Sequence, residues 1–397
     1  MTTNKNHNSP NVPNLRFPEF EGEWEKIKLK DVCTFYSGGT PSSSNKDYYT
    51  GDIPFIRSGE LHESCTELFI SKDGLNNSSA KIVHKGDLLL ALYGATSGDI
   101  AISQIEGAIN QAILCINTEQ SKEYIKAVWQ KHVQKILQTY LQGGQGNLSA
   151  DIVKNISFYF ALSKEQDKLA NFIRLLDERI ATQNKIIEDL KLLKSAIIDY
   201  IFNNDVLSVR KRIHLSDVAT KVTQKNTNNH VSNVLSNSAN QGIIPQSEVF
   251  DREIANEDNT SNYFVISQND FVYNPRKSAT APYGPINRYN GRTDGVISPL
   301  YLCFRSHNIN VEYLGWYFKS NSWYKYVDQN GDTGVRHDRV SIKDEIFFSM
   351  PLFIHNADEQ IEIAKRLNKT ESFVKQEEQY LFLLESQKLY LLQHLFI

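Results

Sequence analysis

An internal repeat constrains this sequence more than any other feature. The segment KIKLKDV at residues 26–32 returns as RIHLSDV at 212–218, and GAINQAILCI at 107–116 returns as GVISPLYLCF at 295–304. Two further pairs keep the same order, KGDLLLA at 85–91 with QNDFVYN at 268–274 and EQDKLA at 165–170 with EQIEIA at 359–364. Cys115 falls on Cys303, and the offset drifts from about 185 to 194, as insertions in loops would produce. The chain is therefore a tandem duplication.

Each copy combines a globular unit with a long helical segment. The globular units, about 140 residues each, contain short apolar runs typical of strands, such as AILCI and FVISQNDFVY. Loops rich in Gly, Pro, Asn and Ser separate them, and a helical pattern begins at Glu123. We predict an α+β fold with two mixed α/β domains. The predicted limits are an N-terminal extension at 1–22, a first domain at 23–161, a central helix at 162–204, a second domain at 205–352 and a C-terminal helix at 353–397.

The two helical segments carry the same heptad seam. Apolar residues recur at alternating spacings of four and three, the pattern of helices that pair as a coiled coil. The first seam comprises Leu169, Ile173, Leu176, Ile180, Ile187, Leu190 and Ile197, and the second comprises Ile363, Leu367, Val374, Leu381, Leu384 and Leu391. Polar residues interrupt both seams at positions 194 apart, with Gln183 and Lys194 matched by Glu377 and Lys388.

Neither apolar seam can stay exposed to water, and each helix finds its nearest partner in the other. Because a compact domain connects them, we expect an antiparallel pair that places the two domains at opposite ends, related by a pseudo-twofold axis. A helix of about 38 residues is about 57 Å long, so the pair would act as a spacer. A generic coiled-coil stalk explains the helices alone, but it does not explain two similar domains held apart.

Composition bounds the class of protein. Hydrophobic residues make up 40% and charged residues 22% of the 397, as in globular proteins, and no apolar stretch is long enough to span a membrane. The polar N-terminus does not resemble a secretory signal, and four dispersed cysteines suit reduced thiols, so we expect a cytoplasmic protein without membrane contact. With a net charge of −3, any nucleic acid would have to be held by local basic patches.

The sequence offers no catalytic or metal-binding motif. It contains no GxxxxGK[ST], GxSxG or HExxH pattern and no Cys/His set with metal spacing. Asn274-Pro275-Arg276 resembles the start of the adenine methyltransferase motif but lacks its second proline and its aromatic residue. Glu188, Asp189 and Lys191 lie on the outer face of the predicted helix, where solvated charges are expected. We therefore expect no catalytic residue, no metal and no cofactor on this chain.

Basic residues gather in the loops instead. Residues 271–293 contain no acidic residue, and GVRHDR at 334–339 adds a second basic cluster. Arginine and lysine contact phosphates, and arginine also bonds the guanine edge. The candidates for base or phosphate contact are Arg57, Arg276, Lys277, Arg288, Arg292, Arg336 and Arg339. The alternative is that they belong to ordinary solvated loops.

Several motifs together resemble the specificity subunit of Type I restriction–modification enzymes. They are PNLRFPEFEGEW at 13–24, YGATSGDIAI at 93–102, NQAILCI at 110–116, GGQGNLSADIVKNI at 143–156 and the helical segment at 165–194. Their order, the duplication and the paired helices carry the resemblance over nearly the whole chain. The family often has proline near the position of Ala161, and the second copy shows PYGPI and SPLYL in place of YGAT and NQA.

The resemblance implies two target recognition domains, each reading one half of a bipartite DNA site, with the helices as spacer and docking surface. It implies double-stranded DNA and two modification subunits as partners, together with restriction subunits. S-adenosylmethionine, ATP and Mg are expected on those subunits, and this chain would be non-catalytic by itself. Two rival functions stay open, a coiled-coil protein-interaction scaffold without a DNA-reading role and a self-contained enzyme such as a fused methylase.

Overall fold

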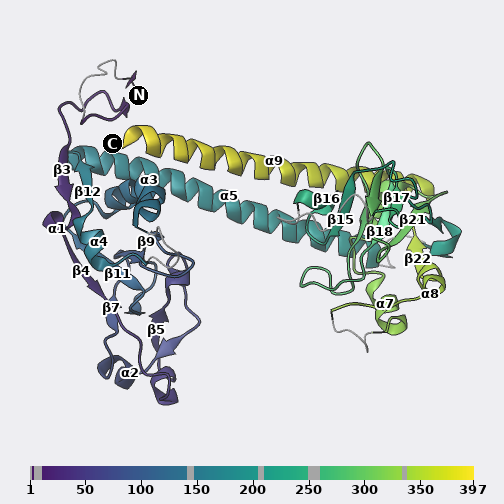
Figure 1. Ribbon diagram of the computed structural model, residues 1–397, viewed down its shortest axis with the longest axis horizontal. Coiled ribbons are helices and arrows are strands. Elements are labelled where there is room, and N and C mark those ends of the chain that lie inside the picture. Colours follow the sequence, from purple (N-terminus) through teal and green to yellow (C-terminus); the bar gives the residue numbers. More distant parts are fainter. Residues whose placement is uncertain (1, 4–10, 141–146, 204–209, 249–259, 333–337) are drawn as a thin grey trace. The chain divides into compact units, whose positions relative to one another are not determined.

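The computed structural model describes residues 2–3, 11–140, 147–203, 210–248, 260–332 and 338–397. The chain divides into two compact units (Figure 1), unit 1 with residues 1–184 and 379–397, and unit 2 with residues 185–378. In the part of the chain covered by these ranges, no helix combines the length and apolar character needed to cross a membrane.

Unit 1 contains two four-stranded sheets and two smaller ones. The first sheet has the order β6 (Phe69–Ile70), β5 (Ile53–Ile56), β10 (Gly107–Ile109), β7 (Lys81–Val83). The second has the order β4 (Cys33–Ser37), β11 (Ile113–Thr118), β8 (Leu88–Ala91), β9 (Ile100–Ile102). β12 (Ser157–Phe160) pairs with β3 (Glu25–Lys28), and β1 (Thr2–Thr3) with β2 (Leu15–Arg16). Its shorter helices are α1 (Leu29–Val32), α2 (Lys72–Asn76), α3 (Lys122–Tyr140) and α4 (Ala150–Asn155).

Unit 2 repeats the two four-stranded sheets and the β3–β12 pair strand for strand. Its first sheet has the order β16 (Gly242–Pro245), β15 (Val234–Ser238), β20 (Gly295–Ile297), β17 (Phe264–Ile266). Its second has the order β14 (Ala219–Lys221), β21 (Leu302–Ser306), β18 (Asp270–Tyr273), β19 (Ile286–Arg288), and β13 (Lys211–His214) pairs with β22 (Pro351–Ile354). Its shorter helices are α6 (Val311–Tyr317), α7 (Tyr324–Asn330) and α8 (Asp344–Phe348).

The repeat extends to strand register. Cys115 on β11 lies opposite Leu89 on β8, and its counterpart Cys303 on β21 lies opposite Val272 on β18. In each unit one strand pair of the first sheet is parallel, β5 with β10 and β15 with β20. The sequence repeat is therefore a repeat of topology, and the predicted α+β fold with a tandem duplication is confirmed.

The largest helix within the domains differs between the copies. The single long helix α3 of unit 1 corresponds to two short helices, α6 and α7, in unit 2. The sequence Ser320-Asn321-Ser322 separates them, and the Ser320 hydroxyl donates to the carbonyl of Tyr317 at 2.6 Å. Serine and asparagine compete with helical hydrogen bonds in this way, which ends α6 early.

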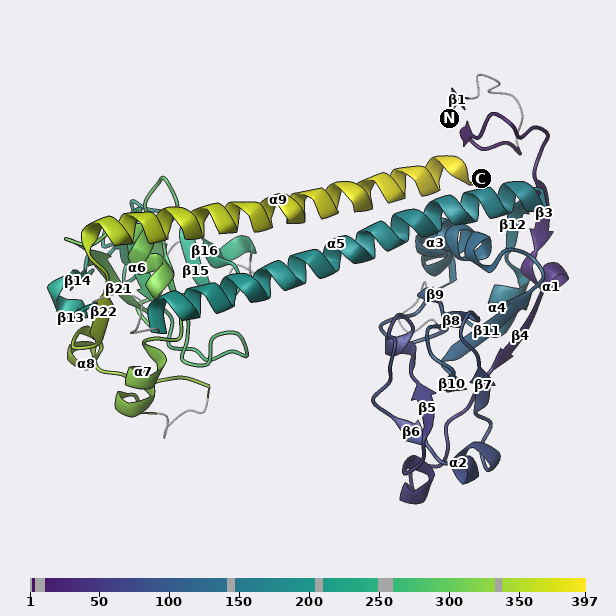
Figure 2. The ribbon, with the colours of Figure 1, turned by 180° about the vertical axis from the view of Figure 1, so that it is seen from behind.

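Two long helices, α5 (Ser163–Asn203) and α9 (Ala357–Leu395), each contribute to both units. They lie side by side in both views (Figures 1 and 2). In unit 1, Lys388 Nζ lies 2.7 Å from Asp177 Oδ1, and in unit 2 Lys194 Nζ lies 2.6 Å from Glu371 Oε2. Since higher numbers on α5 pair with lower numbers on α9, the helices are antiparallel, as predicted.

The predicted seam residues are buried to different degrees. The fully buried ones are Leu169, Ile173, Ile187, Leu367, Val374, Leu384 and Leu391. The half-buried ones are Leu176, Ile180, Leu190, Ile197, Ile363 and Leu381. The helix ends join the domain cores, because Leu391, Leu392 and Leu395 pack with Trp24 and Tyr124 in unit 1. Ile198 and Phe202 pack with Tyr313 in unit 2 in the same manner.

Candidate nucleic-acid interface

In each unit, one hairpin connection is tied to the segment that precedes a short helix. In unit 1 the amide of Leu148, before α4, donates to the carbonyl of Leu92 in the β8–β9 connection at 2.9 Å. In unit 2 the amide of Val340, before α8, donates to the carbonyl of Pro275 in the β18–β19 connection, also at 2.9 Å. The same backbone hydrogen bond, which we call the tie, therefore joins two loops that lie far apart in the sequence of each copy.

In unit 2 this tie brings two predicted basic clusters together. Arg276 lies opposite Arg339 in an antiparallel bridge, and opposite residues of such a pair share one face. Both arginines line a cavity of about 210 Å³ together with Asn237, Asn274 and Leu300. We call this cavity the arginine cleft. Its remaining lining residues are Ser236, Ser238, Pro275 and Tyr301.

The other predicted residues of unit 2 lie outside the arginine cleft. Lys277 follows Arg276 and is half-buried, and its amide donates to the carbonyl of Asp338 at 2.9 Å. Arg288, at the end of β19, is 3.9 Å from a carboxylate oxygen of Glu312 and lines a separate cavity. Arg292 is exposed in the β19–β20 connection. Arg336 lies outside the described residues.

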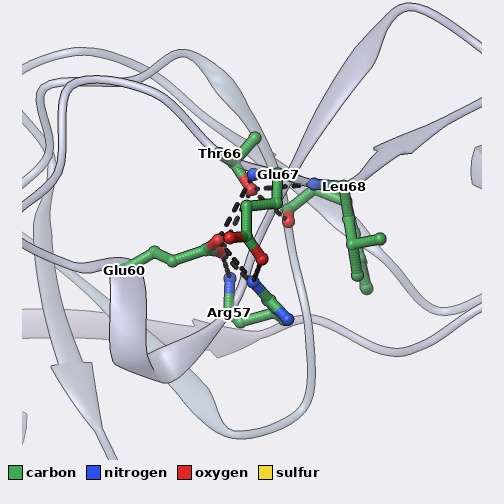
Figure 3. Close-up of polar contacts among 6 residues, drawn as sticks. Arg57, Glu60, Thr66, Glu67 and Leu68 are labelled. Carbon is green, nitrogen blue, oxygen red and sulfur yellow. Dashed lines mark hydrogen bonds and ion pairs between the residues drawn. The ribbon is translucent and has the colours of Figure 1, made fainter. Parts of the chain in front are cut away.

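Arg57, the candidate in unit 1, is part of an internal ion-pair cluster (Figure 3). Its Nη2 donates to Glu60 Oε1 and to Glu67 Oε2, both at 2.7 Å, and its Nε donates to Glu60 Oε2 at 3.2 Å. Glu60 also accepts from the Arg57 amide and the Thr66 hydroxyl, each at 3.0 Å. Two guanidinium nitrogens of Arg57 therefore already have carboxylate partners.

These contacts control the protonation of the cluster. Burial alone would raise the pKa of Glu60, but the hydrogen bonds from Arg57, Glu67 and Thr66 outweigh it and lower the pKa to about 2. Hydrogen bonds to Glu60 and Glu67 raise the pKa of Arg57. A separate contact joins His62 to Asp99. His62 Nε2 lies 2.9 Å from both carboxylate oxygens of Asp99, and this interaction raises the pKa of His62.

The glycine-rich loop at 37–45 is shaped by packing. A Cβ at Gly38 would collide with the carbonyl oxygen of Ile109, so the backbone of this loop lies directly on β10. The next hydroxyl, Thr40 Oγ1, donates to Gln111 Oε1 at 2.6 Å. The loop therefore reaches the NQA motif of the first copy, whereas most of the QGGQGN segment at 142–147 lies outside the described residues.

Sequence reasoning missed several residues at these sites. Asn237, Asn274 and Leu300 line the arginine cleft but are not among the predicted contact residues. The equivalent ties at Leu92 and Pro275 align Tyr93 with Arg276 and Asn147 with Arg339, and only the structure shows these ties.

Within the described ranges, no group of three or more His, Cys, Asp or Glu side chains could hold a metal ion. The four cysteines are free thiols; Cys65 is exposed, while Cys33, Cys115 and Cys303 are buried.

Apolar side chains also lie on the outer faces of the long helices. On α5 the exposed ones are Leu175, Ile186, Leu192, Leu193 and Tyr200. On α9 they are Ile361, Phe373, Phe382, Leu383, Leu389 and Tyr390. These eleven side chains are candidates for contact with a protein partner.

Comparison with known proteins places this architecture. The family profile described as Type I restriction modification DNA specificity domain matches residues 21–192. The Type I restriction enzyme MjaIX specificity subunit of Methanocaldococcus jannaschii is 28% identical over 196 residues, 45% of this chain and 44% of that protein. The MjaVIII specificity subunit of the same organism is 23% identical over 207 residues, 51% of this chain and 46% of that protein. The chain thus spans about half the length of the curated relatives it matches.

The fold agrees with a solved structure over its full extent. The S subunit of the Type I restriction–modification system from M. genitalium superposes with a TM-score of 0.57 at 13% identity, covering 97% of this chain and 99% of that one. This likeness concerns the fold, and the family profile and the named relatives add the sequence evidence. Residues 21–192 therefore match a Type I restriction modification DNA specificity domain, and the chain has the fold of a Type I S subunit.

Proposed function

We propose that this chain is the DNA sequence-recognition subunit of a Type I restriction–modification complex, in which each unit reads one half of a bipartite target. The observation that carries the proposal is the duplicated frame with different side chains at equivalent loop positions. The tie between the two loops is the same in both units, yet it presents Tyr93 and Asn147 in one and Arg276 and Arg339 in the other. Two recognition domains with the same fold but different contact residues suit two different half-sites.

The paired helices would set the spacing between half-sites. A helix gains about 1.5 Å per residue and B-DNA about 3.4 Å per base pair. Inserting four residues near Gln183 and four at the facing part of α9 would therefore lengthen the gap by about two base pairs while leaving both half-site sequences unchanged. A change in the half-sites themselves would contradict the spacer role.

The exposed apolar residues on α5 and α9 would dock two modification subunits. These partners would carry S-adenosylmethionine and methylate adenine, and restriction subunits would carry ATP and Mg. This chain would then contribute recognition without catalysis, and the complex would act on double-stranded DNA in the cytoplasm. Sharing of phosphate contacts among subunits would offset the net charge of −3 on this chain.

The test is to co-express the chain with its modification subunit and map N6-methyladenine across the host genome. The proposal predicts a split motif, with two short half-sites around a fixed gap, that disappears when the modification subunit is expressed alone. A soluble, assembled complex without methylation or salt-dependent DNA binding would favour the scaffold function. A continuous motif would retain DNA recognition but contradict the two-part reading. Binding of S-adenosylmethionine by this chain alone would favour the fused methylase.

A further inference from the structure

The arginine cleft of unit 2 joins two guanidinium groups on one face of a rigid loop pair. We infer that Arg276, with Arg339 opposite it, reads a guanine in the half-site bound by unit 2. The inference rests on the proposed function and deepens it, because it assigns a base and the residues that determine it. Three observations support it: the backbone at Arg276 is held, both guanidinium groups are available, and unit 1 differs at the same place.

The backbone at Arg276 is held from both sides. The Arg276 amide donates to Asn274 Oδ1 at 3.0 Å, and the flanking amides of Lys277 and Val340 donate across the bridge at 2.9 Å. Gly284 supports the same turn, because its φ of +83° and its closeness to the Asn274 carbonyl leave no room for a side chain. A loop fixed before binding loses less entropy when it meets its ligand.

Buried asparagines anchor Asn274 in turn. Asn274 Nδ2 donates to the carbonyl of Asn237 at 2.9 Å, and Asn237 Nδ2 donates to the carbonyl of Val272 at 2.7 Å. Asn287 Nδ2 donates to Asn237 Oδ1 at 2.6 Å. Asn237 and Asn287 are only 2% and 3% exposed, so their hydrogen bonds are shielded from water. Such fully bonded buried networks fix one local conformation, here that of the loop carrying Arg276.

The two guanidinium groups remain available for a ligand. Arg276 is exposed and forms no side-chain hydrogen bond or ion pair within the ranges that the structure describes. Arg339 makes only a loose contact, its Nε lying 3.9 Å from Asp338 Oδ2, and this buried Nε has no hydrogen-bond partner there. Arg57, with two of its nitrogens bound to carboxylates, shows the opposite state.

Guanine is the base that matches these donors. Its major-groove edge carries two adjacent acceptors, N7 and O6, which a planar guanidinium bonds in a bidentate manner. A phosphate would also accept from arginine, and the lysine substitution described below separates the two ligands. Leu300, 64% exposed in the lining of the cleft, offers the apolar contact that the thymine methyl of a neighbouring base pair accepts and a phosphate does not.

Unit 1 lacks this chemistry at the equivalent place. Tyr93 and Asn147 replace the two arginines, and the β8–β9 connection at 92–99 contains no lysine or arginine. Tyrosine and asparagine cannot offer the double guanidinium donor that suits guanine. Unit 1 is therefore an internal comparison, and the two half-sites should differ at the position that these loops contact.

The experiment maps methylation by the complete complex with Arg276→Lys, Arg276→Ala or Arg339→Ala. Lysine keeps the positive charge that a phosphate needs but loses the bidentate geometry that guanine needs. We expect the wild type to require guanine at one position of a single half-site. Arg276→Lys and Arg276→Ala should reduce that preference by about ten- to a hundredfold and leave the other half-site unchanged.

Arg212→Ala is the matched control, because Arg212 is an exposed arginine on β13 of unit 2, outside the cleft and not among the predicted contact residues. It should leave the base preference intact and at most lower methylation at all sites evenly. Unchanged thermal unfolding shows that each variant is folded. Should Arg276→Lys keep full guanine preference while Arg276→Ala weakens all sites alike, Arg276 is a phosphate contact and the inference is wrong.

Two outcomes separate the inference from the proposed function. A split motif without guanine in the half-site that responds to the cleft variants overturns the inference and leaves the proposed function standing. Absence of any split motif with a folded, assembled wild-type complex overturns the proposed function, and the inference falls with it.

Discussion

The lysines that interrupt the two helical seams form equivalent ion pairs, and replacing them should have unequal effects. Lys194 pairs with Glu371 in unit 2, and Lys388, 194 residues further on, pairs with Asp177 in unit 1. Asp177 has a second cation, because Lys126 Nζ lies 3.1 Å from its other oxygen. We predict that Lys194→Met loosens the helix pair more than Lys388→Met does.

The magnitude follows from exposure and distance. The side chains of Lys194 and Glu371 are 21% and 32% exposed, so water screens them only in part. At about 4 Å and an effective dielectric constant of about 20, two unit charges attract by about 4 kcal/mol before desolvation and ordering are subtracted. The net contribution of such a pair is about 1–2 kcal/mol. Lys388→Met should cost less than about 1 kcal/mol, since Lys126 still neutralises Asp177.

Hydrogen–deuterium exchange of the full chain measures the two effects separately. Peptides from α9 at 365–378 report on unit 2, and peptides at 379–395 report on unit 1. A loss of about 1–2 kcal/mol in local opening free energy accelerates exchange about five- to thirtyfold. We expect Lys194→Met to do this at 365–378 and to leave 379–395 nearly unchanged.

A charge exchange supplies the control. Combining Lys194→Glu with Glu371→Lys retains an opposite pair and should restore most of the protection that Lys194→Glu alone removes. Equal effects of the two Met variants would refute the role assigned to Lys126. No change in either region would refute the claim that these lysines stabilise helix pairing.

Three further predictions concern single residues. Glu60→Gln should lower the free energy of unfolding at pH 7 by about 1–2 kcal/mol. This is less than the shift of the Glu60 pKa from 4.5 to about 2 implies, because the side chain of its arginine partner is 41% exposed. In urea unfolding, the stability advantage of the wild type over the variant should be complete above about pH 4.5 and vanish as the pH falls to about 2. Iodoacetamide at pH 8 should modify Cys65 at least about tenfold faster than the three buried cysteines, whose thiol pKa burial raises, and equal rates by mass spectrometry would contradict their burial. Gly284→Ala should lower the free energy of unfolding by about 2–3 kcal/mol, because the new Cβ collides with the Asn274 carbonyl. Gly242→Ala, at a similar φ of +79° but in open space, should lower it by about 1 kcal/mol. Equal losses in urea unfolding would show that φ alone matters.

The frame was predictable because its signals are local and occur twice. The alignment of Cys115 with Cys303 anticipated equivalent strands in both copies, and those strands occupy equivalent places in their sheets. The seam periodicity likewise predicted the antiparallel helices. The sequence Glu-Gln occurs in both copies, at 165–166 and 359–360, and the structure shows why the glutamine is repeated. Gln166 Nε2 and Gln360 Nε2 each donate to a carbonyl five residues earlier at 2.8 Å. A packing role of this kind recurs wherever the frame recurs.

The sites were less predictable because they depend on contacts between distant loops. Nothing in the local sequence indicates that Arg276 and Arg339 meet, since the tie that joins them is a backbone bond between Pro275 and Val340. Arg57 illustrates the opposite error. A carboxylate three residues later, at Glu60, was visible in the sequence, but whether it would hold the arginine depended on the turn between them. DNA contact by each predicted residue stays a prediction, as do the proposed domain limits.

A duplicated chain nevertheless contains its own comparison. Positions that pack the frame agree in both copies in character or identity, as at Cys115 and Cys303 or at Gln166 and Gln360, because the same cavity must be filled twice. Positions where the backbone is held identically but the side chains differ have no such packing constraint. Arg276 against Tyr93 is a difference of this second kind, on a loop whose tie to its neighbour is unchanged. Since a fixed backbone with a changed side chain alters what is contacted without altering the fold, these positions are where two readers built on one frame can acquire two specificities.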